Sequence, residues 1–134
     1  MKIVLNTNCL IQSIPERSPY YGVWLSVEKG DHTFCVSNEI LEEYAEIRGR
    51  LTNSRTAETV IKAIINNPHV EFITPYYHFN LIDEDPDDNK FVDCAITANA
   101  SFIVSNDRHY HVLKQISYPK VDVVFLKEFV TLLS

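Results

Sequence analysis

The sequence of 134 residues has little of what membrane proteins, disulfide-linked proteins and basic nucleic-acid-coating proteins need. No apolar run approaches the roughly 18 residues of a membrane-spanning helix. There are three glycines and three cysteines, and the cysteines form no Cys-x-x-Cys pair. Eighteen Asp and Glu against twelve Lys and Arg give a formal charge of -6, which argues against a broad basic surface. We therefore expect no membrane association, and only a local contact with any nucleic acid.

Composition and cysteine usage also predict the cellular compartment of the protein and its number of domains. Cys9, Cys35 and Cys94 stand in separate apolar surroundings, which favours a reducing compartment and a role as small core residues. The apolar start meets Asn6 too early for a secretory signal, so we expect a soluble cytoplasmic protein. At 46% hydrophobic residues, a chain of this length can bury its own core. We predict a single domain spanning residues 1–134.

Short segments rich in β-branched and aromatic residues alternate with stretches long enough for helices. The predicted strands are Ile3–Leu5, Thr33–Val36, Val70–Ile73, Phe102–Val104 and Val121–Phe125. This alternation is typical of a parallel sheet covered by helices on both faces. We predict an α/β fold with three layers, in which helices flank a mostly parallel sheet of four or five strands.

A helix is predicted to begin at Ser37, a good N-cap residue. Its apolar stripe consists of Ile40, Leu41, Tyr44, Ile47 and Leu51. Four glutamates share the helix, and at about 100° per residue Glu43 falls nearest the stripe, while Glu39, Glu42 and Glu46 lie farther round. Glu43 is therefore the glutamate expected to border the core.

Two more helices are predicted in the second half of the chain. One follows Asp85-Pro86-Asp87-Asp88, where Asp87 or Asp88 can cap, and runs over Phe91–Ala98. This helix is apolar nearly all round, so the presence of the charged Asp93 within it requires an explanation. Another, over 53–67, reads as an amphipathic covering helix that Pro68 stops.

Polar residues follow two of the predicted strands. Asn6-Thr7-Asn8 follows the first and Ser105-Asn106-Asp107 the fourth, at the sheet edge where ligands of parallel α/β proteins collect. Glu43 and Asp93 could face the same crevice. Crowded carboxylates need a hard cation, and oxygen-only ligation indicates Mg²⁺ or Mn²⁺. The five histidines have no partners at zinc spacing, which argues against zinc.

Four segments together resemble the PIN-domain family, and within it the small bacterial VapC-like proteins described as toxins of toxin-antitoxin pairs. The segments, which occur in the family's order and span nearly the whole chain, are Val4-Leu5-Asn6-Thr7-Asn8-Cys9-Leu10, Ser37-Asn38-Glu39-Ile40-Leu41-Glu42-Glu43-Tyr44, Asp85-Pro86-Asp87-Asp88-Asn89-Lys90-Phe91-Val92-Asp93-Cys94-Ala95 and Val104-Ser105-Asn106-Asp107. The resemblance implies a metal-dependent ribonuclease that hydrolyses RNA phosphodiesters, with Mg²⁺ or Mn²⁺ at the carboxyl edge of a parallel sheet. It also implies a small antitoxin partner and a homodimer.

The resemblance also assigns roles to particular residues. Its catalytic carboxylates are Glu43, Asp93 and Asp107, and its metal ligands are Asn6, Glu43, Asp93 and Asp107, with Asp88 as an additional acid. Thr7 and Ser105 match small hydroxyl positions, and Lys90 and Arg108 are candidates for contact with the substrate. The basic residues Arg108, His109, His111 and Lys114 directly follow Asp107 and could form a rim around the acidic centre, or be a plain exposed helix.

Asn6 stands where the family has an aspartate. The substitution lowers the charge of the four-residue cluster from -4 to -3, so we expect a more weakly held ion. Two alternatives to an active nuclease stay open. One is a degenerate PIN module that binds RNA or an antitoxin without cleavage. The other is a phosphoacceptor or phosphatase, although that class needs an aspartate nucleophile where this chain has Asn6.

Overall fold

Within the residues that the structure describes, 1–46, 54–82 and 86–133, five strands form one sheet in the order β3-β2-β1-β4-β5. The structure is a computed structural model. Each neighbouring pair of strands is parallel. The strands are β1 (Lys2–Leu5), β2 (Thr33–Val36), β3 (Val70–Phe72), β4 (Phe102–Val104) and β5 (Val123–Val124). The predicted parallel sheet is confirmed, although β5 is shorter than the expected Val121–Phe125.

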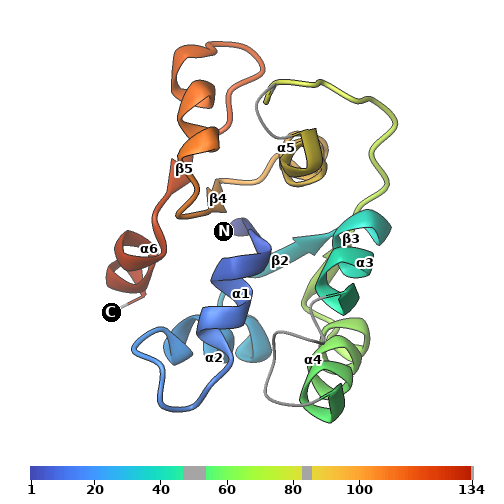
Figure 1. The fold of residues 1–134 in the computed structure, drawn as a ribbon, viewed down its shortest axis with the longest axis vertical. Helices are drawn as coiled ribbons and strands as arrows, with labels where there is room; N and C mark the ends of the chain where they lie inside the picture. Colours follow the sequence, from blue (N-terminus) through green and yellow to red (C-terminus); the bar gives the residue numbers. More distant parts are fainter. Residues whose placement is uncertain (47–53, 83–85, 134) are drawn as a thin grey trace.

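Helices lie on both faces of the sheet. They are α1 (Thr7–Ser13), α2 (Tyr21–Lys29), α3 (Asn38–Glu46), α4 (Ser54–Asn66), α5 (Asn89–Ala98) and α6 (Leu126–Leu132), with 3-10 helices η2 (Pro86–Asp88) and η3 (Arg108–Gln115). Figure 1 shows α5 on one face, α1 and α2 on the other, and α3 and α4 beside β3. The three-layer arrangement is therefore confirmed. Of the described helices, none is long and apolar enough to cross a membrane.

Helix α3 begins as its sequence indicates. The backbone N–H of Ile40 donates to the Ser37 Oγ at 3.2 Å, which is an N-cap interaction. Ile40 and Tyr44 are buried, while Ile47 and Leu51, the predicted continuation of the stripe, lie outside the described residues. The predicted helix before Pro68 is also confirmed, since α4 ends at Asn66.

Helix α5 begins directly after Asp88, as predicted, but its cap differs from the expectation. A 3-10 turn, η2, leads into the helix, and the Asp88 side chain makes no capping hydrogen bond. The physical reason is that its carboxylate faces His109, 3.6 Å from the ring Nδ1, and so does not turn back onto its own helix. Asp85, expected just before this helix, lies outside the described residues.

The core includes all three cysteines, as predicted. Cys9, Cys35 and Cys94 are buried and free. Burial raises the pKa of the Cys94 thiol to about 12, so it stays protonated and packs as a small apolar group.

Tyr44 joins α3 to the carboxyl end of β1. Its hydroxyl donates to the Leu5 carbonyl oxygen at 2.6 Å, and its ring stacks on Phe34 with centroids 6.3 Å apart. Burial raises the pKa of this phenol well above its ordinary value, so it remains a neutral donor. This bond holds the neighbouring Glu43 close to the residues that follow β1.

Replacing Tyr44 with Phe removes that donor and leaves the buried Leu5 carbonyl oxygen without the hydroxyl. We expect Tyr44→Phe to lower the free energy of unfolding by about 1 to 2 kcal/mol, measured by urea denaturation. The control is Tyr76→Phe, because Tyr76 is 84% exposed and its loss should cost less than about 0.5 kcal/mol. Equal effects of the two substitutions would contradict this role for Tyr44.

Candidate metal centre at the carboxyl edge of the sheet

The ends of β1 and β4 bring two predicted site residues to one edge. The strands are parallel neighbours in which Leu5 pairs with Val104. The Asn6 backbone N–H continues this pairing by donating to the Val104 carbonyl oxygen at 3.0 Å. Asn6 and Asp107 therefore leave the sheet at the same edge, as the sequence predicts. Both line a cleft of about 460 Å³.

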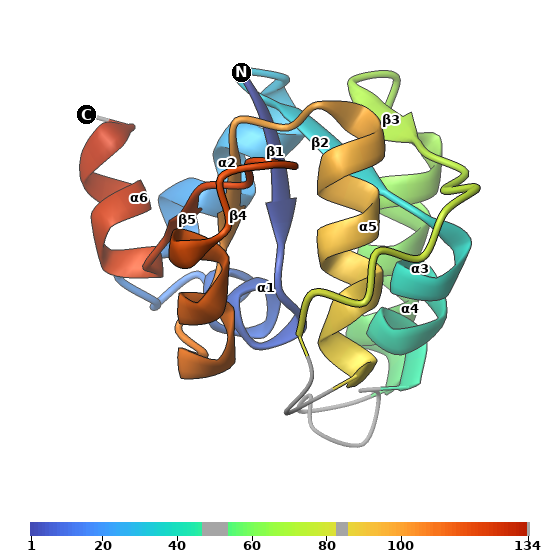
Figure 2. The ribbon, with the colours of Figure 1, turned by 90° about the horizontal axis from the view of Figure 1, so that it is seen from above.

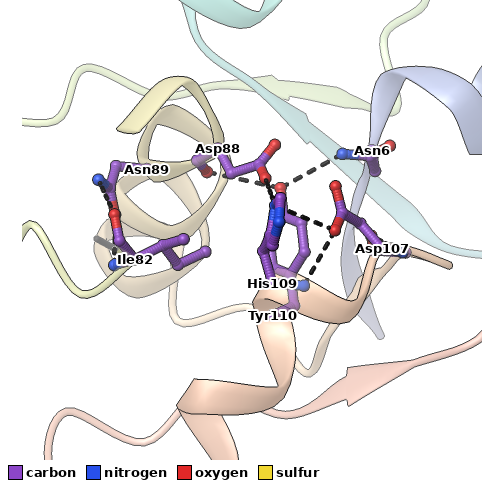
Figure 3. A network of polar contacts seen from close by, with 8 residues as sticks. Asn6, Ile82, Asp88, Asn89, Asp107, His109 and Tyr110 are labelled. Atoms are coloured by element: carbon purple, nitrogen blue, oxygen red, sulfur yellow. Dashed lines mark hydrogen bonds and ion pairs between the residues drawn. The ribbon is translucent and has the colours of Figure 1, made fainter. Parts of the chain in front are cut away.

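Asn6 is the N-cap of α1 and is 7% exposed. Its Oδ1 accepts from the Asn8 backbone N–H at 3.2 Å, and its Nδ2 donates to the Tyr110 hydroxyl at 3.3 Å. That hydroxyl donates to the Asp88 backbone carbonyl at 3.5 Å. Burial raises the pKa of Tyr110 well above its ordinary value. A neutral phenol thus connects the residue after β1 to η2 (Figure 3).

Two carboxylates and an imidazole converge next to Asn6. The Asp107 Oδ1 lies 3.2 Å from the His109 Nδ1, and the Asp88 Oδ2 lies 3.6 Å from the same nitrogen. One ligand atom from each of these three residues falls within 4.8 Å of the others. Figure 3 shows the three side chains facing one another, with Asn6 beside them. Among the described residues this is the group of His, Cys, Asp and Glu able to hold a metal ion.

Local backbone geometry positions Asp107. It caps η3, because its Oδ1 accepts from the His109 backbone N–H at 2.9 Å. Its own N–H donates to the Ser105 Oγ at 3.0 Å. Ser105 is fully buried, and by accepting this hydrogen bond its hydroxyl positions the loop.

Glu43 is tied to the site through a hydroxyl and an ammonium group. The buried Thr7 Oγ1 donates to its Oε2, and the Lys90 Nζ donates to its Oε1 at 2.9 Å. Glu43 is half-buried while Glu39, Glu42 and Glu46 are exposed, which confirms that Glu43 is the glutamate bordering the core. Desolvation lowers the pKa of Lys90, but the hydrogen bond and charge of Glu43 outweigh it and the pKa is raised. Lys90 is therefore a counter-ion for Glu43.

Asp93 does not belong to the group of Asp88, Asp107 and His109. It is 3% exposed, and its Oδ1 accepts from the Phe79 backbone N–H at 3.0 Å while its Oδ2 lies 3.3 Å from the His78 Nδ1. Its carboxylate thus anchors the extended segment that follows β3, which runs alongside α5 in Figure 2. Glu43 and Asp93 line a second cavity of about 340 Å³.

This placement corrects the expectation that Asn6, Glu43, Asp93 and Asp107 converge at one point. The structure brings Asp88, the additional acid of the sequence prediction, next to Asp107 in place of Asp93. Asp93 lies five positions after Asp88, a rise of roughly 7 Å along a helix. The expectation of oxygen-only donors also changes, because the group includes the His109 nitrogen. Of the residues predicted to contact the substrate, Arg108 is exposed. The side chains of Thr7, Ser105 and Lys90 instead make hydrogen bonds within the protein.

From the sequence, His109 is expected only as part of a basic rim, and Tyr110 is not singled out. Their partner Asp88 is about twenty positions away, so no ligand spacing reveals them. The signal that was present is the closeness of His109 to Asp107, two residues apart in a loop after a strand.

A family model described as PIN domain matches residues 2–109. The chain belongs to the PIN-domain family. The matched range includes the three residues of the metal-centre group, Asp88, Asp107 and His109, and their neighbour Asn6. PIN domains are generally nucleases, and PIN nucleases usually use divalent metal ions. No curated protein sequence matches significantly.

Solved structures of the same fold include two assemblies. One is VapBC2 from Rickettsia felis bound to a DNA fragment from their promoter, with 19% identity, a TM-score of 0.64, and coverage of 93% of this PIN domain chain and 98% of that chain. The other is VapBC-1 from nontypeable Haemophilus influenzae, with 13% identity, a TM-score of 0.64, and coverage of 95% and 99%. At these identities the likeness concerns the fold.

The contacts of Asp93 predict a structural role in this PIN domain. Replacing Asp93 with Ala leaves the Phe79 N–H without its acceptor, so we expect the free energy of unfolding to fall by about 1 to 3 kcal/mol. Hydrogen exchange at the Phe79 amide should become faster, while the affinity for Mn²⁺ should change less than about threefold. The control is Asp122→Ala, whose side chain is 59% exposed. A loss of Mn²⁺ binding with unchanged exchange would show that Asp93 is a ligand.

Proposed function

We propose that this PIN domain is a divalent-metal-dependent endoribonuclease that hydrolyses RNA phosphodiesters and acts as the toxin of a toxin-antitoxin pair in the cytoplasm. The observation that carries the proposal is the convergence of the Asp88 and Asp107 carboxylates beside Asn6 at the carboxyl edge of the sheet. Family membership supports nuclease chemistry. The edge is where α/β proteins bind their ligands.

The donor set fits a divalent cation. Two carboxylates a few ångströms apart repel each other unless a positive charge lies between them. Asp88 and Asp107 would hold Mg²⁺ or Mn²⁺, the ions that carboxylate and carbonyl oxygens favour, and the Asn6 amide oxygen can add a neutral donor. Glu43 is outside this group and is bonded to Thr7, the residue that follows Asn6, so its negative charge would act from the border of the site.

The residues around the carboxylates prepare the site for hydrolysis. A bound divalent ion supplies Lewis-acid stabilisation of the charge that develops on the phosphate and lowers the pKa of a water molecule. Asp107 is held by Ser105 and by the start of η3, so its oxygens stay aimed at Asp88. Tyr110 keeps η2 and the end of β1 together. These supports preorganise the negative pocket before a substrate arrives.

RNA would be contacted locally, because the chain carries a formal charge of -6. Arg108 is exposed and directly follows Asp107, so its guanidinium can meet a phosphate next to the scissile one. The cleft of about 460 Å³ beside Asn6 and Asp107 is open to such a strand. Lys90 does not serve this purpose while it neutralises Glu43.

A small antitoxin is the proposed protein partner, and a homodimer is the proposed assembly. Two solved structures of this fold are VapBC assemblies, and one of them is bound to promoter DNA. These assemblies are those of other proteins, and the shared fold supports the proposal of a similar partner for this chain.

Asn6 favours a second candidate function, a PIN module that binds RNA or an antitoxin without cleavage, because an amide adds no charge to the site.

The nuclease proposal predicts RNA cleavage that depends on Mg²⁺ or Mn²⁺ and on the convergent carboxylates. Asp107→Asn should lower the cleavage rate at least about a hundredfold, since it removes one of two charges that face the ion. Cleavage of a fluorescent RNA is the measurement, and EDTA should abolish it. Asp122→Asn is the control and should retain the rate. Cleavage that persists both with EDTA and in the Asp107→Asn variant would contradict the proposal.

Asn6→Asp separates a weakened enzyme from a non-cleaving module. The added charge should raise Mn²⁺ affinity about tenfold in calorimetry and accelerate RNA cleavage. Asn8→Asp adds the same charge at an exposed neighbour on α1 and should change the affinity less than about threefold. Tighter Mn²⁺ binding with no cleavage would favour the binding module.

A further inference from the structure

We infer that the His109 imidazole is a ligand of the metal centre, and that its nitrogen makes the site prefer Mn²⁺ to Mg²⁺. The inference rests on the proposed metal centre and adds to it a donor and a selectivity. Neither the spacing of the histidines nor the resemblance to PIN domains assigns His109 this role.

The distances fit three ligands of one ion. Ligands of Mn²⁺ at about 2.1 to 2.2 Å lie about 3.0 Å apart when adjacent in an octahedron and about 3.5 Å apart in a tetrahedron. The His109 Nδ1 lies 3.2 Å from the Asp107 Oδ1 and 3.6 Å from the Asp88 Oδ2. Both distances lie within a few tenths of an ångström of these ligand separations, and the oxygens of Asp88 and Asp107 lie within 4.8 Å of each other.

The imidazole is held in this place by the same contacts that build the site. The backbone N–H of His109 donates to the Asp107 Oδ1 at 2.9 Å, so the start of η3, from which the imidazole projects, is fixed beside Asp107. The next residue, Tyr110, is fully buried and bonded to Asn6 and to the Asp88 carbonyl. Asp88 and His109 therefore approach each other because η2 and η3 share one anchor.

The chemistry of the donors gives the selectivity. Mg²⁺ takes oxygen ligands almost exclusively, whereas imidazole nitrogen suits first-row transition metals and Mn²⁺ lies at their weak end. With Asn6 neutral, the oxygens of Asp88 and Asp107 give two negative charges where an additional aspartate would give a third. His109 adds a donor that Mn²⁺ accepts and Mg²⁺ does not favour.

A second His–carboxylate pair in the same chain provides the comparison. His78 lies 3.3 Å from the Asp93 Oδ2, much as His109 lies by Asp107. Its side chain is 67% exposed, and it does not belong to a described group of three convergent ligands. His78→Ala therefore removes an imidazole beside a carboxylate without touching the proposed centre.

The test measures Mn²⁺ and Mg²⁺ binding by calorimetry, together with pulsed electron paramagnetic resonance of bound Mn²⁺. We expect the unsubstituted protein to show nuclear modulation from a coordinated ¹⁴N, replaced by ¹⁵N modulation when histidine is labelled. His109→Ala should lose this signal and weaken Mn²⁺ binding at least about tenfold, while Mg²⁺ affinity changes less than about threefold. His78→Ala should retain both the signal and the affinity.

Two results would overturn the inference while leaving the metal centre intact. One is Mn²⁺ bound by the unsubstituted protein without nitrogen modulation. The other is an equal loss of Mn²⁺ and Mg²⁺ affinity in His109→Ala, which would mean that the ring only supports the carboxylates. If Asp107→Asn leaves Mn²⁺ binding unchanged, the metal centre itself fails and the inference fails with it.

Discussion

The carboxylates of Asp88 and Asp107 are held facing one nitrogen of His109, and most of what surrounds them keeps two like charges in that position. Like charges at this separation raise the free energy of the folded chain unless a cation lies between them. The backbone contacts of Ser105 and Tyr110 are therefore not incidental packing. They maintain a preorganised negative pocket that the proposed divalent ion would stabilise.

The parallel pairing of β1 and β4 is what makes this pocket possible. Both strands end at one edge, so the residues that follow them leave the sheet side by side although they are about a hundred positions apart. Tyr110 extends this arrangement to a third element, because its hydroxyl contacts Asn6 and the Asp88 carbonyl. A buried phenol that stays protonated suits the task, since it can donate and accept without adding charge.

Asp88 and Asp93 show how environment separates two acids on neighbouring turns. Asp88 lies in η2, ahead of the helix, and its side chain reaches across to η3. Asp93 lies inside α5, and its oxygens are occupied by the Phe79 amide and the His78 ring. Both oxygens of Asp93 are already used within the chain, whereas Asp88 and Asp107 each present an oxygen to a common point and can share a ligand. Net charge and motif order do not distinguish the two.

Local pattern in the sequence determined the elements of this protein. β-branched runs predicted the strands, Ser37 predicted the start of α3, and helical spacing singled out Glu43 as the glutamate nearest the core. These features depend on neighbours within about one helical turn or one strand, so they can be predicted from the sequence. The edge that carries Asn6 and Asp107 also followed, because parallel strands have a defined carboxyl end.

Only the tertiary structure decided which acids meet. Asp88 lies in the η2 turn and its carboxylate faces His109, whereas Asp93 lies within α5 and faces His78 and the Phe79 amide. The presence of His109 in the group depends on the closeness of η2 and η3, which are about twenty residues apart and are connected by the hydrogen bond from the Tyr110 hydroxyl to the Asp88 carbonyl. Such contacts arise from the packing of whole elements, and neither residue type nor spacing encodes the direction of a side chain.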